Sequence, residues 1–231
     1  MSTLRRLARK KDTYENISTR RLLKRRMPAA LEYAAANGDA SWVKELLSKG
    51  AKVEFRNKKG LTPLLYAVQG GHTEVCKLLL NTGKANVKET TPDGFTPLLL
   101  SAQLGHTEVC ELLIADGSDL EERDPTTLLT ALHNAVGQQS LLQVLLSHKA
   151  DVNSRSRTGG TPLRLASQEG YLASVVTLLE AGADPLLPNE HGGLPIHEAA
   201  GGNHSEVVKI LIEQGRCSPD QVRNPDCTVI T

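Results

Sequence analysis

The clearest candidates for covalent chemistry are two histidine–cysteine pairs. His72 precedes Cys76 by four residues, and His106 precedes Cys110 by four, each time within the phrase HTEVC. On a helix this spacing is about one turn, and an imidazole beside a thiol is the arrangement of a Cys–His nucleophile. A nucleophilic cysteine also needs a lowered thiol pKa. Both cysteines have apolar neighbours and stand where other copies of the phrase have Val, so we expect buried, unreactive thiols.

The histidines and the remaining motifs do not point to a metal, a cofactor or catalysis. His191 and His197 fall on different expected segments, and no Cys or second His lies at zinc-like spacing from either. The sequence contains no phosphate-binding glycine loop and no GxSxG or HExxH motif. We therefore expect no catalytic residue, no metal ligand and no cofactor, and we predict that the chain is not an enzyme.

The composition favours a folded chain built from many small packing units. Hydrophobic residues make up 39% of the 231 residues and charged residues 23%, whereas aromatic residues make up only 3%. No apolar run is long enough to span a membrane. Four cysteines are too few for a disulfide scaffold in a chain of this length. A reducing compartment is therefore expected, which means the cytoplasm, with the nucleus as a further location.

One phrase recurs along most of the chain. The sequence GLTPLLYAVQGGHTEVCKLLL at residues 60–80 returns at residues 94–114, 159–179 and 192–212, and less regular copies lie at residues 28–47 and 128–146. Counted at the Thr of the TPL phrase, the markers are residues 29, 62, 96, 130, 161 and 194, which are 31 to 34 residues apart. Such self-similarity predicts a stack of units that are each too small to bury their own apolar face.

The residues of this phrase predict two helices followed by a loop. Thr can cap free backbone N–H groups and Pro is tolerated in the first helical turn, so each Thr-Pro begins a helix. Apolar residues then recur at helical spacing. Glycines such as Gly71 end the first helix, where a positive φ is needed, and glycines such as Gly83 and Gly117 close the second. The polar stretch before the next Thr predicts an extended loop with a tight turn.

The period near 33 residues and the TPLH-like, GH-like and LLxxGAD-like phrases resemble those of the ankyrin repeat family. The resemblance covers about residues 28–215 and implies an all-α solenoid of helix-turn-helix units joined by β-hairpin-like loops. It also implies that the imidazoles of these phrases hydrogen-bond neighbouring loops. These imidazoles belong to His72, His106, His133, His197 and, close by, His204.

The repeats are not all regular. We expect the solenoid over residues 28–223, and we interpret NPDCTVIT at residues 224–231 as the start of an incomplete seventh repeat. The 31-residue step between the fourth and fifth markers predicts the loss of two residues from the Gly-His turn, at residues 138–140. The fourth repeat also has Lys149 where the others have Gly. Neutral drift and a loop reshaped for a partner both explain these departures.

Residues 1–27 form a basic arm on an acidic body. They carry ten Lys/Arg and two Asp/Glu, a net charge of +8, while the rest of the chain carries 17 Lys/Arg and 24 Asp/Glu, a net charge of −7. The arm fits a nuclear import signal, a contact for nucleic acid or anionic lipid, a basic amphipathic helix, a mitochondrial presequence, or a partly disordered leader that caps the first repeat. Its densest stretch is RRLLKRR, with Arg20, Arg21, Lys24, Arg25 and Arg26.

In the ankyrin family the hairpin tips and first helices line a concave face, where recognition concentrates. Leu61, Phe95 and Leu129 stand in the same slot of consecutive units and predict an apolar strip. Such a strip, rimmed by charge, is typical of an interface centre, although the same residues could instead shield the hairpin from the next unit. The candidate partner-binding residues are Lys58, Lys59, Leu61, Phe95, Leu104, Leu129, Arg157, Glu190 and His191.

The resemblance implies a scaffold or adaptor that binds a protein partner through this face, with no small-molecule substrate. Two alternatives remain at this point. One is a nuclear or nucleic-acid-associated regulator that acts through the basic arm, and the other is a regulatory fragment of a larger protein. The net negative charge of the body would repel phosphate groups, so the solenoid itself is not expected to bind nucleic acid. Nucleic acid or an anionic membrane is therefore expected to bind only through the arm.

Overall fold

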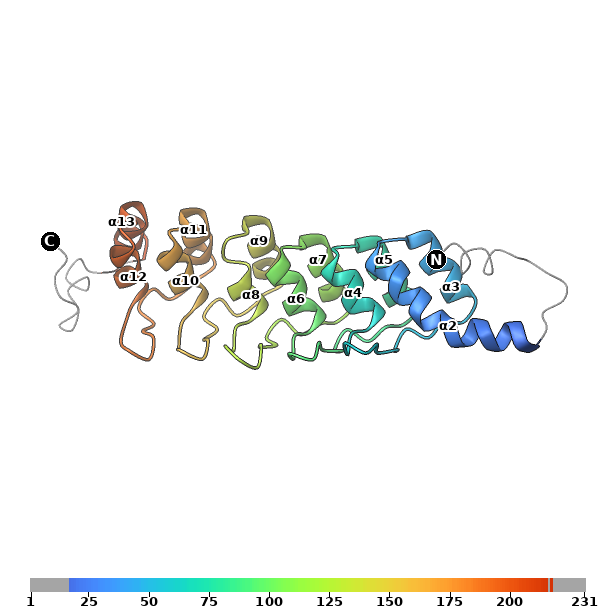
Figure 1. Cartoon of the computed structure of the whole chain (residues 1–231). Coiled ribbons are helices and arrows are strands. Elements are labelled where there is room, and N and C mark those ends of the chain that lie inside the picture. The colour runs from blue at the N-terminus through green and yellow to red at the C-terminus, as the bar shows by residue number, and fades with distance from the viewer. Residues whose placement is uncertain (1–16, 216, 218–231) are drawn as a thin grey trace. The chain divides into compact units, whose positions relative to one another are not determined.

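The chain folds into paired helices. The computed structural model describes residues 17–215 and 217, with side chains from Arg26 onward in the first helix. The described residues form twelve helices and no strand, as the sequence predicts. Figure 1 shows that a long loop leads from each pair to the next. The helices are α2 (Ile17–Ala36), α3 (Ala40–Ser48), α4 (Pro63–Gln69), α5 (Thr73–Asn81), α6 (Pro97–Leu104), α7 (Thr107–Ala115), α8 (Ala131–Asn134), α9 (Gln139–Ser147), α10 (Pro162–Glu169), α11 (Leu172–Glu180), α12 (Pro195–Gly201) and α13 (Ser205–Glu213).

The described residues divide into two compact units. The N-terminal unit contains the residues up to Ser101 together with Glu108–Ser118, and the C-terminal unit contains Ala102–Thr107 together with the residues from Asp119 onward. In the N-terminal unit, α2 packs against α3 and α4, and α4 packs against α5. In the C-terminal unit, α10 packs against α8, α11 and α12, and α11 packs against α9 and α13.

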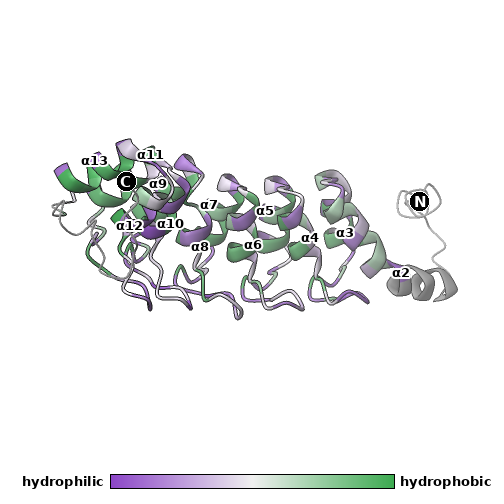
Figure 2. Ribbon diagram, turned by 60° about the vertical axis from the view of Figure 1, so that its left-hand side comes forward, coloured by the Kyte–Doolittle hydropathy of each residue, from purple (hydrophilic) through white to green (hydrophobic). Residues whose placement is uncertain are grey.

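The largest fully buried side chains of each unit are leucines, which face inward from both helices of a pair. Leu64 and Leu79 are fully buried in the N-terminal unit, and Leu163 and Leu178 are fully buried in the C-terminal unit. Burying one such side chain contributes about 1.5–3 kcal/mol. In Figure 2 the hydrophobic colour lies mainly on the helices, whereas much of the hydrophilic colour lies on the loops. The apolar periodicity of the sequence therefore corresponds to the observed core.

The Thr-Pro dipeptides begin first helices as predicted. The hydroxyl oxygen of Thr62 accepts a hydrogen bond from the Leu65 backbone N–H at 3.3 Å, and Pro63 opens α4. Thr161 and Pro162 do the same at the start of α10, where Thr161 accepts from the backbone N–H of Arg164 at 3.2 Å. These caps satisfy N–H groups that have no partner within the helix.

The first repeat departs from this rule. Pro28 lies inside α2, which begins eleven residues earlier, at Ile17. The first repeat has Met27 before its proline and so lacks the Thr-Pro dipeptide that begins the later first helices. A proline inside a helix removes one backbone hydrogen bond, yet the helix continues through it. The last part of the basic arm is consequently continuous with the first helix of the first repeat.

Positive φ values occur at most of the predicted helix ends. Gly71 has a φ of 65° and Gly117 a φ of 90°. After α5, however, it is Lys84, with a φ of 55°, and not Gly83 that adopts the left-handed conformation. Lys149 adopts a φ of 65° although it carries a side chain. The left-handed region is unfavourable for residues other than Gly and, to a lesser degree, Asn and Asp, so Lys149 is a strained position.

The two-residue loss in the fourth repeat lies between Thr130 and Gln138, just before the predicted residues 138–140. The first helix of this repeat, α8, has only four residues, whereas the other short first helices have seven or eight. Gln138 occupies the slot of the GH histidines before α9. The turn ahead of it differs from the others, because Gly137 lacks the positive φ of Gly71 and the backbone N–H of Gln138 donates to the carbonyl oxygen of Ala135 at 2.8 Å. The side-chain amide of Gln138 donates to the carbonyl oxygen of Ala102 at 3.2 Å. The shortening therefore affects both the end of α8 and the turn, while the Gln138 side chain keeps the hydrogen bond to the preceding repeat.

Candidate protein-binding surface

The two cysteines of the HTEVC phrases are unsuited to nucleophilic chemistry. Both side chains are fully buried. Burial raises the pKa of the Cys76 thiol to about 12 and the pKa of the Cys110 thiol to about 11, although a hydrogen bond with Ser101 partly offsets the rise at Cys110. The Nε2 atom of His72 lies 3.2 Å from the carbonyl oxygen of Ala36, so this imidazole serves the preceding repeat.

The histidines link neighbouring repeats. Buried His133 accepts a hydrogen bond at Nδ1 from the backbone N–H of Thr130 at 3.2 Å, and its Nε2 lies 3.2 Å from the carbonyl oxygen of Gly160. Burial lowers the pKa of His133 to about 4, so the ring is neutral at pH 7 and donates through Nε2. His204 similarly contacts the carbonyl oxygen of Gln168 at 3.0 Å. These contacts confirm the structural role that the family resemblance implies for these three histidines.

The described residues include neither a metal-binding cluster nor a membrane-spanning helix. No group of three or more His, Cys, Asp or Glu side chains is placed to hold a metal ion there. Among the same residues, no helix is long and apolar enough to cross a membrane.

A polar side chain holds each hairpin tip, a feature that the sequence reasoning missed. The Oδ1 atom of Asn57 accepts from the backbone N–H groups of Lys59 and Leu61 at 2.8 and 3.1 Å. Asn189 does the same for His191 and Gly193 at 2.9 and 2.8 Å. Such side chains mimic a backbone turn. The sequence does contain a signal for this feature, because a short polar residue lies five or six positions before each repeat marker from residue 62 onward. The five residues are Asn57, Thr91, Asp124, Ser156 and Asn189.

Asp124 makes the densest set of these hydrogen bonds. Its carboxylate accepts from the backbone N–H groups of Thr126, Thr127 and Leu129 at 2.7 to 2.9 Å, and from the hydroxyl of Thr127. Burial raises the pKa of Asp124, but these hydrogen bonds outweigh that effect and hold the pKa below its usual range. The anionic form therefore stabilises the tip at residues 125–129 at neutral pH.

Arginines tie each loop to the next within the same unit. In the N-terminal unit, Arg56 donates to the carbonyl oxygen of Thr90 at 2.8 Å and pairs with the carboxylate of Glu89. In the C-terminal unit, Arg123 donates to the carbonyl oxygen of Arg155 at 2.8 Å, and Arg155 in turn donates to that of Pro188 at 2.6 Å. These arginines occupy the same slot, directly before the polar tip residue, and they fix neighbouring loops at a constant offset.

Arg157, a predicted partner contact, also joins two tips. Its guanidinium donates to the carbonyl oxygen of Pro125 at 2.9 Å and to that of Thr126, and its backbone N–H donates to Thr127 at 2.7 Å. The next tip is attached by the backbone N–H of Glu190, which donates to the carbonyl oxygen of Thr158 at 3.1 Å. Arg157 is exposed, but its charge is already used to position the hairpins.

The predicted apolar residues differ in exposure. Three of them are half-buried: Leu61 and Phe95 in the N-terminal unit and Leu129 in the C-terminal unit. This degree of burial fits neither a fully exposed apolar strip nor residues that are fully covered by the next unit. Leu104, in the C-terminal unit, has 44% of its surface exposed. The polar candidates Lys58, Lys59, Glu190 and His191 are all exposed on hairpin tips.

A charged pair on the first helices was also missed. Arg164 on α10 donates to the carboxylate of Glu198 on α12 at 2.8 Å. Arg164 stands in the slot that holds Leu65, Leu99 and His133 in earlier repeats, so the sequence shows the charge but not its partner.

The basic arm lies only partly within the described residues. Arg20, Arg21, Lys24 and Arg25 belong to α2, but their side chains are outside the described part, whereas the side chain of Arg26 is exposed. Residues 1–16 of the arm and the predicted start of a seventh repeat at residues 224–231 also lie outside the described residues.

The chain matches ankyrin repeat family models and ankyrin repeat proteins. The family model for ankyrin repeats in three copies matches residues 31–124 and 122–189, and the single ankyrin repeat model matches residues 191–224. The Caenorhabditis elegans ankyrin repeat and KH domain-containing protein mask-1 is 32% identical over 192 residues, which is 83% of this chain and 6% of that protein. The nuclear factor NF-kappa-B p105 subunit of Gallus gallus is 31% identical over 164 residues, 69% of this chain and 17% of that protein. The chain thus spans a small part of these relatives.

Solved structures give the same result. The ankyrin repeat domain of Bcl-3, described as a member of the IkappaB protein family, matches with a TM-score of 0.74 at 26% identity, covering 84% of this chain and 92% of that chain. A chain in the complex of the Bdellovibrio bacteriovorus predatory endopeptidase Bd0816 with the immunity protein Bd3460 matches with a TM-score of 0.73 at 26% identity, covering 80% of this chain and 97% of that chain.

Proposed function

We propose, because the chain belongs to the ankyrin repeat family, that it binds a protein partner through the face formed by its hairpin tips and first helices. Ankyrin repeat domains are protein–protein interaction modules, and this chain has the fold of one. The proposal assigns the recognition surface within each unit to the tips at residues 58–61 and 92–95, and at residues 125–129, 157–160 and 190–193.

The observation that carries this proposal is that the tips are held in place before any partner binds. Side chains such as Asn57 and Asp124 fix each turn, and Arg157 joins consecutive tips in the C-terminal unit. A surface that is already ordered loses less conformational entropy on binding, so more of its contact energy appears as affinity. The same surface presents Lys59, Glu190 and other charged side chains to solvent.

The chain itself is proposed to have no catalytic activity. The two thiols that could have served as nucleophiles are buried, with a raised pKa.

Site-specific photocrosslinking tests the placement of the binding surface. A photoreactive residue is introduced in place of Lys59 or His191 on the tips, and in place of Lys77 or Lys209 on the second helices α5 and α13 as matched exposed controls. We expect a partner band from cell extract at the tip positions only. Bands of equal strength from Lys77 and Lys209 would refute the assignment to the tips.

A further inference from the structure

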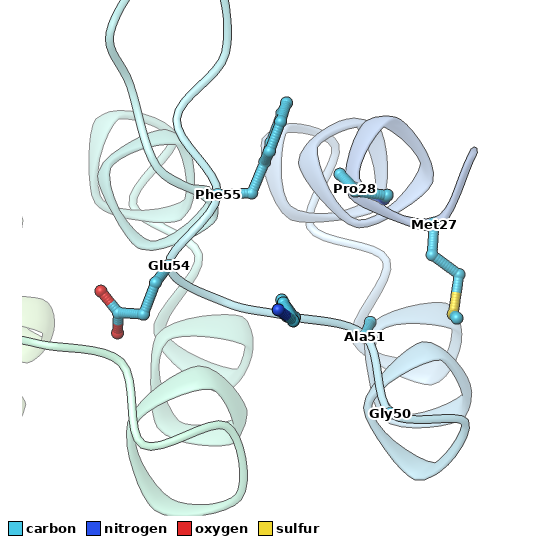
Figure 3. A pocket seen from close by; sticks show the side chains of 7 residues that line it. Met27, Pro28, Gly50, Ala51, Glu54 and Phe55 are labelled. Atoms are coloured by element: carbon cyan, nitrogen blue, oxygen red, sulfur yellow. The ribbon is translucent and has the colours of Figure 1, made fainter. Parts of the chain in front are cut away.

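A groove opens on the N-terminal unit, where α2 passes the loop that follows α3. Its volume is about 700 Å³, which is within the range of pockets that hold ligands. Figure 3 shows Met27 and Pro28 on α2 at one side, Ala51 below them, and Phe55 rising from the loop at the other side. The remaining lining residues are Gly50, Lys52 and Glu54. The groove therefore has largely apolar walls with charged groups at its edge.

Two features of the sequence create this groove. The helix α2 begins at Ile17 and not at Pro28, so Met27 is present as part of the wall. Phe55 then supplies an aromatic ring that is 39% exposed. The same slot in the next three hairpins holds Glu89, Glu122 and Ser154. The fold does not require an apolar residue there, and an exposed ring beside other apolar side chains is typical of a contact surface.

The segment that lines the groove carries a positive net charge. Residues 26–59, which include all the lining residues, carry seven Lys/Arg and four Asp/Glu, a net charge of +3. One of the acids, Glu54, accepts a hydrogen bond from the backbone N–H of Asn86 at 3.2 Å, and Figure 3 shows its carboxylate turned to the side away from Met27. Lys52 in the lining and Arg26 next to Met27 are both exposed. Complementary charge on a ligand would therefore be negative.

We propose that this groove binds an acidic segment of a partner protein, which inserts one large apolar side chain between Met27 and Phe55. The apolar walls would shield the inserted side chain from water. The nearby Lys and Arg would attract Asp and Glu residues that flank this side chain in the partner segment. A nucleic acid fits the groove less well, because proteins bind nucleic acids mainly through the phosphates, which would make no favourable contact with the apolar walls. The lining does not include the hairpin tips at residues 58–61, so this site is separate from the proposed tip surface.

Selection of displayed random peptides on the full chain tests the proposal. The enriched peptides should share an aromatic or aliphatic residue flanked by Asp and Glu. An enriched peptide is then labelled with fluorescein and titrated by anisotropy. Phe55→Glu introduces the residue that later repeats carry in this slot, so the variant should fold, and it should weaken the peptide by about tenfold or more. Lys52→Glu should weaken it by a smaller factor, and added salt should weaken the wild-type complex.

Matched controls separate this site from other surfaces. Leu186→Glu places the same charge at a residue that is 45% exposed in the C-terminal unit, and it should leave peptide affinity unchanged, as should His191→Ala on a tip. Thermal melts verify that each variant is folded. The proposal is overturned if the enriched peptides lack acidic residues, or if Phe55→Glu and Leu186→Glu weaken them equally. It is also overturned if phosphatidylserine vesicles bind with the same Phe55 dependence while the peptides do not.

Discussion

Substitution of His133 should change how the stability of the protein depends on pH. Burial lowers the pKa of this imidazole from 6.5 to about 4, so the unfolded chain binds a proton there at a pH where the folded chain does not. The contribution of neutral His133 to the free energy of unfolding is therefore complete above pH 6.5, and it is lost as the pH falls toward 4. From these two pKa values the loss at about pH 4.5 is about 2.5 kcal/mol. The loss levels off below about pH 4, where both states are protonated.

The variant His133→Leu tests this reasoning, because Leu65 and Leu99 fill the same slot in other repeats. At pH 7 it should be about 1 kcal/mol less stable than the wild type, since the carbonyl oxygen of Gly160 loses its hydrogen-bond donor. At about pH 4.5 the order should reverse, because the variant has no proton to bind at this site.

Urea denaturation followed by circular dichroism at a series of pH values measures both free energies of unfolding. Exposed His191→Leu serves as the control and should keep the pH dependence of the wild type. If the wild type and His133→Leu lose stability in parallel between pH 6.5 and 4.5, then His133 does not titrate as its burial requires and the argument is wrong.

Three further predictions concern single features of the fold and the arm. Lys149→Gly should stabilise the protein by about 1 kcal/mol, because the φ of 65° no longer strains a side chain; an unchanged or lower urea midpoint would contradict this. Asp124→Ala should cost about 2 kcal/mol or more, because three backbone N–H groups lose their acceptor, and it should speed hydrogen exchange at residues 126–129; unchanged exchange would show that the carboxylate does not hold the tip. If the arm is an import signal, nuclear enrichment of a tagged chain should disappear in the triple Ala variant, and an even distribution of the wild type would exclude that role; the substituted residues are Lys24, Arg25 and Arg26.

Much of the fold could be predicted because the repeat makes each element visible several times. The Thr-Pro starts and the inward leucines depend only on local caps and on burial within a pair, which the spacing of the residues records. Most glycines at positive φ could be predicted for the same reason. Lys84 and Lys149 could not, because the backbone conformation there is set by the connection between repeats and not by the residue itself.

Apart from the histidine contacts that the family resemblance implies, the contacts between repeats were beyond sequence reasoning. The hydrogen bonds from Arg123 to Arg155 and from Arg155 to Pro188 depend on the offset between neighbouring loops, which a single repeat does not contain. The two-residue loss in the fourth repeat was misplaced because Gln138 does not resemble His in the sequence, although it makes the same kind of hydrogen bond. The groove beside Phe55 was missed because it exists only when α2 continues past Pro28, where a proline would ordinarily indicate a helix start.

The measurement that tests the central claim most directly is hydrogen–deuterium exchange of the full chain, with and without the partner identified by crosslinking. The claim predicts slower exchange on binding at the hairpin tips, within residues 57–61, 91–95, 125–129, 157–160 and 190–193, and unchanged exchange in the second helices α5, α9, α11 and α13. Slower exchange confined to those second helices, with tips that exchange as in the free protein, would contradict it.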